Sequence, residues 1–175
     1  MTKPGLLFSI IAVLVLLLAG AGGFHLYNTN LEETRQQAVI SLDEGIALFR
    51  EKKYTETLEL LQGIPEGVLE DWHLPYYTAT AMVMLKDYQS AAPVLEEALV
   101  LNPHEPLILY ELGVVYFKLG KLGLSKGYFA KVVEIDPANE QARGLMDVMA
   151  NLERQQPGYD GGDAKVEQTD GDSSH

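Results

Sequence analysis

The stretch LYELGVVY at residues 109–116 decides the fold, because residues like those in and after it return at a fixed interval. Pro103 recurs as Pro137 and Tyr54 recurs as Tyr88, both at an interval of about 34 residues. A period of this length is the signature of helical units stacked into an array, in which each unit buries its apolar face only against its neighbours. Such arrays generally bind other molecules, so the spacing predicts a binding protein.

The third unit, residues 106–139, resembles the signature of the tetratricopeptide repeat (TPR) family. The matching residues are Leu109, Leu112, Gly113, Tyr116, Ser125, Phe129 and Pro137, with Leu109 where the family pattern has Trp and Ser125 where it has Ala. Shifts by one repeat length give two further units, 72–105 and 38–71. The resemblance implies an all-α fold in which three helix-turn-helix repeats stack as a right-handed solenoid.

The first two units depart from the family pattern in different places. The unit 72–105 fits the closing half of the pattern and fits the opening half poorly, where Pro75 stands. The unit 38–71 ends in GIPEG, residues 63–67, and has Leu69 at the position of the closing proline. Because glycine and proline both break helices, we expect the second helix of the first repeat to stop early.

The spacing also predicts how the helices of each repeat pack. Small residues should let the two helices approach closely, and they are Gly45, Ala79 and Gly113 in the first helices and Thr57, Ala91 and Ser125 in the second. Large residues should form a continuous core, and they are Leu48, Met82 and Tyr116 with Leu61, Leu95 and Phe129. About three units are needed to bury such a core.

The chain after the third repeat divides into a helix and a tail. In residues 138–156, an apolar set at helical spacing predicts an amphipathic capping helix, namely Ala142, Leu145, Met146, Met149 and Leu152. From residue 157 to residue 175 the sequence is polar and acidic, so it cannot bury enough surface to order itself. We therefore expect a disordered acidic tail that lacks the ligand order of a calcium loop.

The amino-terminal residues predict a membrane segment. Residues 5–23 contain no charged residue, and the apolar run extended to residue 27 approaches the roughly 20 residues that span a bilayer. The small residues around Ala21 also have the form of a signal cleavage site, which leaves removal of the segment open. We favour a retained signal anchor over residues 5–27. Lys3 before it places residues 1–4 in the cytoplasm and the repeats outside, which in a bacterium is the periplasm or the cell surface.

The segment between anchor and repeats is short. Asn30 followed by Glu33 resembles a capping box, so we expect a helix that begins at Leu31, a connector of residues 28–30 and a TPR-like domain of residues 31–156. The domain would then stand close to the membrane, where a membrane-associated partner could reach it.

The TPR resemblance implies a concave groove lined by the first helix of each repeat. Carried over to this chain, the groove residues are Leu42, Ile46, Phe49, Tyr76, Tyr77, Thr80, Tyr110, Val114 and Phe117, flanked by Val39, Arg50, His73, Val83, Met84, Leu107 and Lys118. Leu42, Ile46 and Thr80 stand where family members that clamp the carboxylate of chaperone tails carry polar or basic residues. An apolar, aromatic groove instead favours an amphipathic helix or an extended apolar peptide.

Tyrosines suit the role of anchors in such a groove, because they add apolar area and a polar tip at low entropic cost. We take Tyr76, Tyr77 and Tyr110 as the candidate anchors. Tyrosines at helical spacing also occur as core residues, and that interpretation stays open for them.

Composition and motifs exclude other classes. The formal net charge is -12, and the longest basic run is Lys52-Lys53, which argues against nucleic-acid binding. No phosphate loop, nucleophile elbow or paired-histidine metal motif is present, so we expect neither catalysis nor a cofactor nor a metal.

These observations lead to one main hypothesis. The chain is a non-enzymatic, single-pass inner-membrane protein whose extracytoplasmic TPR domain is a scaffold or adaptor for a peptide or helix of a partner in a bacterial envelope complex. Within this class, an accessory subunit of cytochrome c maturation or of secretion or pilus assembly has the same layout. The alternative is a secreted or self-associating structural TPR protein. Signal cleavage and the formation of homo-oligomers would support this alternative.

Overall fold

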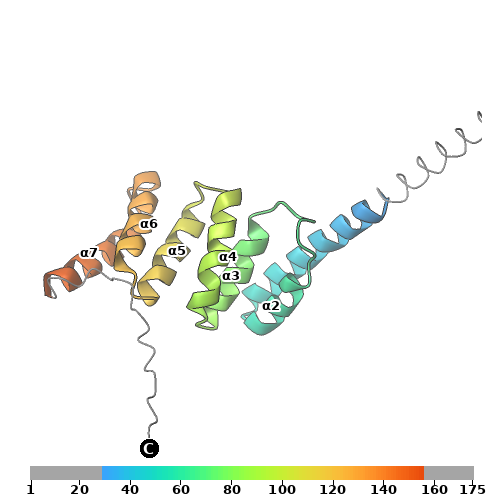
Figure 1. The fold of residues 1–175 in the computed structure, drawn as a ribbon, viewed down its shortest axis with the longest axis horizontal. Coiled ribbons are helices and arrows are strands. Elements are labelled where there is room, and N and C mark those ends of the chain that lie inside the picture. Colours follow the sequence, from blue (N-terminus) through green and yellow to red (C-terminus); the bar gives the residue numbers. More distant parts are fainter. Residues whose placement is uncertain (1–28, 156–175) are drawn as a thin grey trace, which may run out of the picture.

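The computed structural model describes residues 29–155, and this part of the chain is helical without strands. Residues 29–50 form a first helix, which is followed by α2 (Tyr54–Gln62), α3 (His73–Met84), α4 (Tyr88–Leu101), α5 (Pro106–Lys118), α6 (Leu122–Ile135) and α7 (Glu140–Gln155). From α2 onward each helix contacts the next one along the chain. Figure 1 shows the resulting row of helices, with the first helix at one end and α7 at the other. The predicted all-helical solenoid is confirmed.

The predicted anchor at residues 5–27, the residues 1–4 before it and the acidic tail at residues 157–175 lie outside the described residues. Among residues 29–155, no helix is long and apolar enough to cross a membrane.

The structure corrects the predicted start of the first helix. Residues 29 and 30 are already helical, so the helix does not begin at Leu31 and residues 29–30 are no connector. The hydroxyl of Thr34 donates to the carbonyl of Asn30 at 2.8 Å. Asn30 is therefore part of a helical turn and does not act as the expected N-cap.

The small residues predicted at the contacts within each repeat are all buried. A Cβ atom at Gly45 would lie 2.3 Å from Cδ2 of Leu61, and one at Gly113 would lie 2.7 Å from Cε1 of Phe129. Each glycine thus makes room for the large residue 16 positions later in the partner helix. The predicted large residues are also in the core, except that Leu48 is only partly buried; the fully or nearly fully buried ones are Met82, Tyr116, Leu61, Leu95 and Phe129.

The turns between the two helices of a repeat share one geometry. Lys52, Lys86 and Gly120 have φ values of 64°, 68° and 75°, and they are spaced one repeat length apart. In the third repeat, the amide of Lys121 bonds to the carbonyl of Tyr116 and the amide of Gly120 bonds to that of Phe117. The same pair of bonds occurs at the other two turns. This left-handed cap satisfies the last carbonyls of each first helix and reverses the chain.

The early end predicted for the second helix of the first repeat is confirmed. Helix α2 has 9 residues, whereas α4 and α6 each have 14. After Gly63, the loop folds back on the first pair of helices, where Ile64 is buried beside Leu61. The first helix therefore extends beyond α2 at its amino-terminal end.

Helix α7 covers the end of the third repeat, as the prediction of a capping helix required. Its N-cap is Asn139, whose side chain accepts the amide of Ala142 at 2.9 Å. Ala142 and Met149 are fully buried against Phe129 and its neighbours, while Leu152 remains 42% exposed. The apolar face of α7 thus packs on the stack over its first three turns.

Candidate protein-binding surface

The first helices of the repeats place the predicted groove residues at different levels of exposure. Leu42, Tyr76 and Thr80 are buried at 5%, 9% and 7% exposure. The remaining predicted residues are partly buried, and we call the surface that they form the first-helix surface: Ile46, Phe49, Tyr77, Tyr110, Val114 and Phe117. Of the flanking residues, Val39, Met84 and Leu107 are exposed. Tyr77 is thus more accessible than Tyr76.

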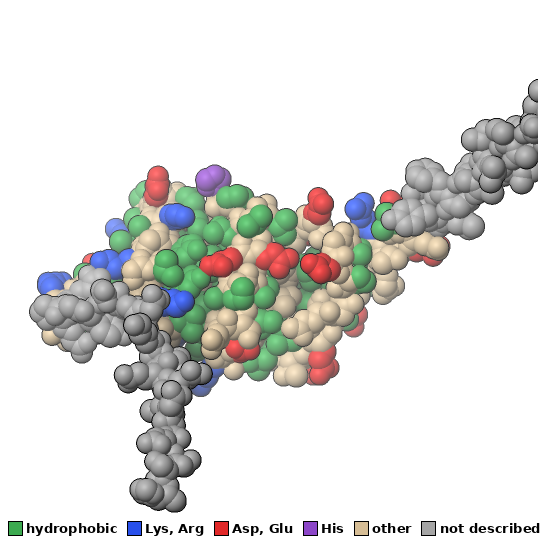
Figure 2. Space-filling model, in the orientation of Figure 1, with side chains coloured by type: hydrophobic (Ala, Val, Ile, Leu, Met, Phe, Trp, Pro, Cys, Tyr) green, Lys and Arg blue, Asp and Glu red, His purple; other side chains and the backbone are tan. Residues whose placement is uncertain are grey.

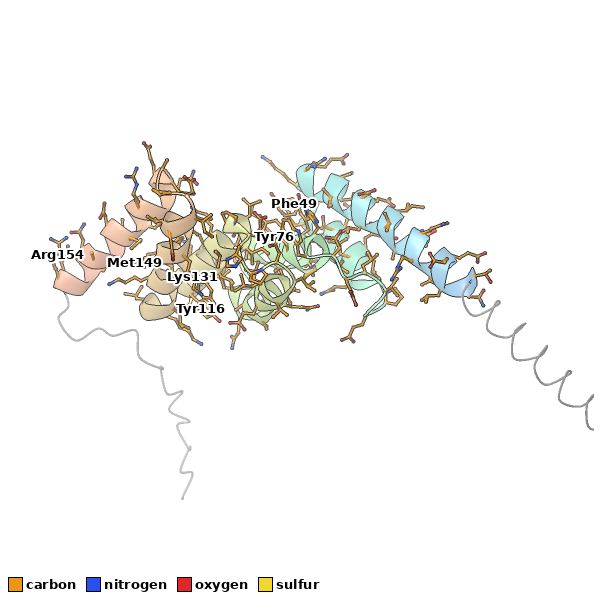
Figure 3. The ribbon with its side chains drawn as sticks, turned by 90° about the horizontal axis from the view of Figure 1, so that it is seen from above. Phe49, Tyr76, Tyr116, Lys131, Met149 and Arg154 are labelled. Carbon is orange, nitrogen blue, oxygen red and sulfur yellow. The ribbon has the colours of Figure 1, made fainter. Side chains whose placement is uncertain are left out.

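The aromatic residues of the first two repeats touch one another in a continuous series. Figure 3 shows Phe49 and Tyr76 in the same part of the stack. The ring of Phe49 lies 5.4 Å from that of Tyr77, which lies 5.3 Å from that of Tyr76. Tyr76 lies 5.6 Å from Trp72, whose ring stacks on His73 at 3.8 Å. This aromatic chain joins the first helix to the beginning of α3 and presents large, rigid side chains partly to solvent.

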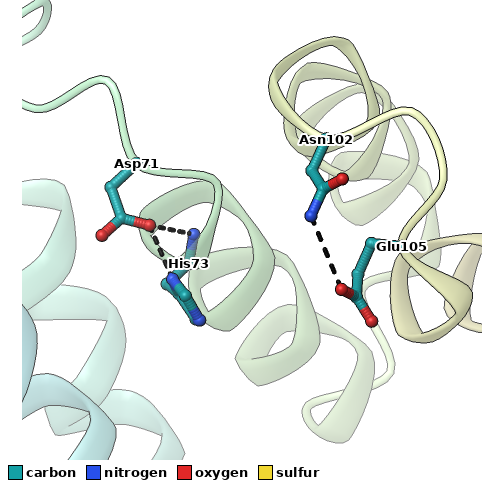
Figure 4. A network of polar contacts seen from close by, with 4 residues as sticks. All are labelled: Asp71, His73, Asn102 and Glu105. Atoms are coloured by element: carbon teal, nitrogen blue, oxygen red, sulfur yellow. Dashed lines mark hydrogen bonds and ion pairs between the residues drawn. The ribbon is translucent and has the colours of Figure 1, made fainter.

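Polar side chains fix the loops that precede α3 and α5 (Figure 4). Oδ1 of Asp71 accepts the backbone amide of His73 at 2.9 Å and lies 2.6 Å from its Nδ1. Glu105 accepts from the side-chain amide of Asn102 at 3.5 Å and from the backbone amide of Leu107 at 3.4 Å. Both carboxylates therefore help to begin a first helix.

The predicted residues in the third repeat pack toward the other end of the stack. Tyr110, Val114 and Phe117 contact the cluster that contains Phe129 and Met149, and the rings of Tyr110 and Phe129 are 5.5 Å apart. These side chains support the capping helix as well as contributing to the first-helix surface. Glu111 follows Tyr110 on α5 and is close enough to Tyr76 on α3 for its charge to act on that phenol.

Glu111 is the charged residue that changes the electrostatics of this surface. Burial raises the pKa of its carboxyl above the ordinary value of 4.5. Burial, and after it the negative charge of Glu111, raises the pKa of Tyr76 to about 12. The same two causes raise the pKa of Tyr110. The carboxylate on α5 thus acts on a phenol of α3 and on one of its own helix.

Two hollows of the surface lie away from the predicted residues. One, of about 500 Å³, lies between the first helix and the end of α2, with Gln37, Ala38 and Ile64 in its lining. Another, of about 580 Å³, lies where α4, α5 and α6 meet, with His104 and Ile135 in its lining. Residues 29–155 contain no group of side chains arranged to hold a metal ion.

Sequence reasoning missed Trp72 and Glu111. Trp72 stands at the first position of its repeat, immediately before α3, and no motif marked it. Glu111 could have been found by comparing registers, because Tyr77 and Leu145 stand one repeat length before and after it. Tyr77 and Leu145 pack against core clusters, so a carboxylate at this register is a departure from the pattern.

Residues 82–152 match the family model of the tetratricopeptide repeat. The first TPR of Spaghetti (RPAP3) bound to the HSP90 peptide SRMEEVD is 24% identical, with a TM-score of 0.64, over 68% of this chain and 94% of that one. The second TPR domain of human RPAP3, in complex with the HSP70 peptide SGPTIEEVD, is 26% identical, with a TM-score of 0.60, over 67% of this chain and 98% of that one.

A further relative is Cell division cycle protein 27 homolog A from Arabidopsis thaliana. It is 29% identical over 120 residues, which are 67% of this chain and 16% of that protein. The chain thus spans about a sixth of the length of this relative. Together, these likenesses support the TPR family, and the fold is a TPR-like solenoid.

Proposed function

We propose that this TPR domain is a scaffold or adaptor that binds a peptide or helix of a partner protein on its first-helix surface. The observation that carries the proposal is the aromatic chain from Phe49 to Trp72, together with Tyr110 in the next repeat. Clustered aromatic side chains that keep part of their surface in water are typical of the centres of protein interfaces. The two RPAP3 domains, which share the fold, are described in complex with peptides.

We propose that the partner segment of this protein differs in chemistry from the HSP90 and HSP70 peptides bound by the RPAP3 domains. The peptides SRMEEVD and SGPTIEEVD end in acidic residues and a carboxylate. Such an end requires basic side chains in the binding surface. Helix α3 contains no Lys or Arg, and the basic residues that flank the surface, Arg50 and Lys118, stand only at the ends of the first helix and of α5. The first-helix surface therefore suits a different class of segment.

The setting in our proposal is the bacterial envelope. The apolar residues 5–27 would anchor the chain in the inner membrane, with the repeats outside the cytoplasm and near a membrane-associated partner. Alkaline extraction of membranes, combined with the intact mass of the mature protein, tests this anchor. A protein released by alkali and shortened to begin after Ala21 would contradict it.

The binding proposal is tested by purifying the full chain in detergent and identifying what copurifies. Tyr77→Ala and Tyr110→Ala should each remove the partner while the helical circular dichroism spectrum is kept. Tyr128→Ala is the matched control, because Tyr128 is a partly buried tyrosine on a second helix, α6. Retention of the partner by both first-helix variants would contradict the proposal.

A second candidate function is self-association through the uncovered end of the stack. Val39 and Ile40 on the first helix are 45% and 58% exposed, and no helix among the described residues covers them. Light scattering of the purified chain measures the oligomeric state. A discrete oligomer that Ile40→Glu converts to a monomer would favour this candidate.

A further inference from the structure

The first-helix surface carries an acidic group at a register where the neighbouring repeats have apolar contacts. Tyr77 packs between the first helix and α3, and Leu145 packs between the third repeat and α7. Glu111 takes the equivalent place between α3 and α5, which contact each other directly. A carboxylate loses hydration in such a place, and an unpaired one weakens the packing of the two helices.

Nothing within residues 29–155 compensates the charge of Glu111. In this part of the chain its carboxylate forms neither an ion pair nor a hydrogen bond with another residue. The basic residue of its own helix, Lys118, is seven residues away, about 10 Å along the helix axis. Glu105, which caps α5, is a further acid close to Tyr76. The site therefore offers negative charge and no positive charge.

The charge distribution around the site has the same sign. Residues 54–117 contain ten acidic residues and a single basic one, Lys86. Residues 118–155 contain six basic and five acidic residues. Figure 2 shows one face of the stack, on which acidic side chains lie among hydrophobic ones over the middle, and Lys and Arg are more frequent toward α6 and α7. A basic segment is attracted to the middle of a stack with this distribution of charge.

We propose that the segment bound on the first-helix surface is basic, and that one of its arginine or lysine side chains pairs with Glu111 between Tyr76 and Tyr110. This inference rests on the proposed function and specifies the chemistry of the partner. The alkyl stem of the basic residue would lie on the partly exposed ring of Tyr110, and its cationic head would face the carboxylate. Arginine suits the site best, because its planar guanidinium both stacks on aromatic rings and bonds to carboxylates.

The experiment uses the full chain in detergent and three amphipathic helical peptides on one leucine-rich template. The polar positions of the peptides carry arginine, glutamine or glutamate, and binding is measured by fluorescence anisotropy. We expect the arginine peptide to bind most tightly and the glutamate peptide least tightly. Glu111→Gln should weaken binding of the arginine peptide about tenfold and leave the glutamine peptide unchanged.

Glu97→Gln is the matched control, because Glu97 is an exposed acid on α4, a second helix. It removes the same charge outside the first-helix surface. An equal loss of affinity in Glu97→Gln would show only an effect of net charge and would overturn the proposal. No binding of the arginine peptide, no effect of Glu111→Gln, or tightest binding of the glutamate peptide would also overturn it.

The failure of this inference is distinguishable from the failure of the proposed function. If Tyr77→Ala weakens all three peptides while Glu111→Gln changes none, then the first-helix surface binds segments without preference for charge. If Tyr77→Ala changes none of the peptides, then the surface itself is not the binding site.

Discussion

The close approach of the two helices in the third repeat makes Gly113 the most demanding position of the fold. In the Gly113→Ala variant, the new Cβ would lie 2.7, 2.8 and 2.9 Å from three atoms of the Phe129 ring. That ring has 0% exposure and is held by the core on its other sides. The ring cannot move away without displacing its neighbours, so one of the two helices must shift.

The size of the effect follows from comparison with Gly127→Ala. Gly127 also lies within a helix, α6, but a Cβ there meets no atom within 4 Å. Both substitutions gain about 1 kcal/mol of helix propensity. Only Gly113→Ala adds the cost of overpacking, which is about 1–3 kcal/mol. The difference between the two variants therefore measures the packing cost alone.

The assay is thermal unfolding of the full chain in detergent, followed by circular dichroism at a helical wavelength. We expect Gly113→Ala to melt below Gly127→Ala by roughly 4–12 °C, since 1 kcal/mol corresponds to about 4 °C for a domain of this size. If Gly113→Ala melts at or above Gly127→Ala, the helices of the third repeat do not approach as closely as the structure shows.

Three further predictions each concern one residue and use the same unfolding assay. Ser125→Ala removes the buried bond from the Ser125 hydroxyl to the carbonyl of Gly113 at 2.7 Å and should cost about 1–3 kcal/mol; an unchanged melting temperature would contradict this. Lys86→Gly relieves a φ of 68° and should stabilise the domain by up to about 1 kcal/mol, so a lower melting temperature would argue against strain at this turn. For Glu111 the folded-state pKa is raised, so its favourable contribution is full below the unfolded value near 4.5 and is lost as the pH rises through the folded value. Glu111→Gln should therefore gain stability relative to the parent as the pH is raised from about 4 to 7, and a constant difference would contradict the burial of the carboxylate.

The architecture could be predicted from the sequence because the same packing problem recurs in each repeat. Gly45 and Gly113 each face a large residue 16 positions later, and this arrangement leaves a periodic trace in the chain. The early end of α2 was likewise predictable, because Gly63 and Pro65 act through the local backbone alone. The turn at Lys52 was not predicted, since lysine rarely adopts the left-handed conformation that glycine adopts at the equivalent turn.

The candidate site could be predicted only in part. The repeat register identifies which residues lie on the first helices, but it does not give their exposure, which depends on the packing angle of the next repeat. Tyr76 was a candidate anchor and is 9% exposed, whereas Tyr77 keeps more of its surface accessible. Trp72 joins the aromatic chain through contacts with α3, and no local motif carries that information.

The central claim is that a partner segment binds on the first-helix surface, and photo-crosslinking from single positions tests it most directly. A photoreactive phenylalanine analogue replaces Tyr77, Tyr110 or, as the control on α6, Tyr128, in the full chain expressed in living cells. The account predicts that positions 77 and 110 give an adduct with the same partner segment and that position 128 gives none. An adduct from position 128 alone, or no adduct from positions 77 and 110, would contradict it.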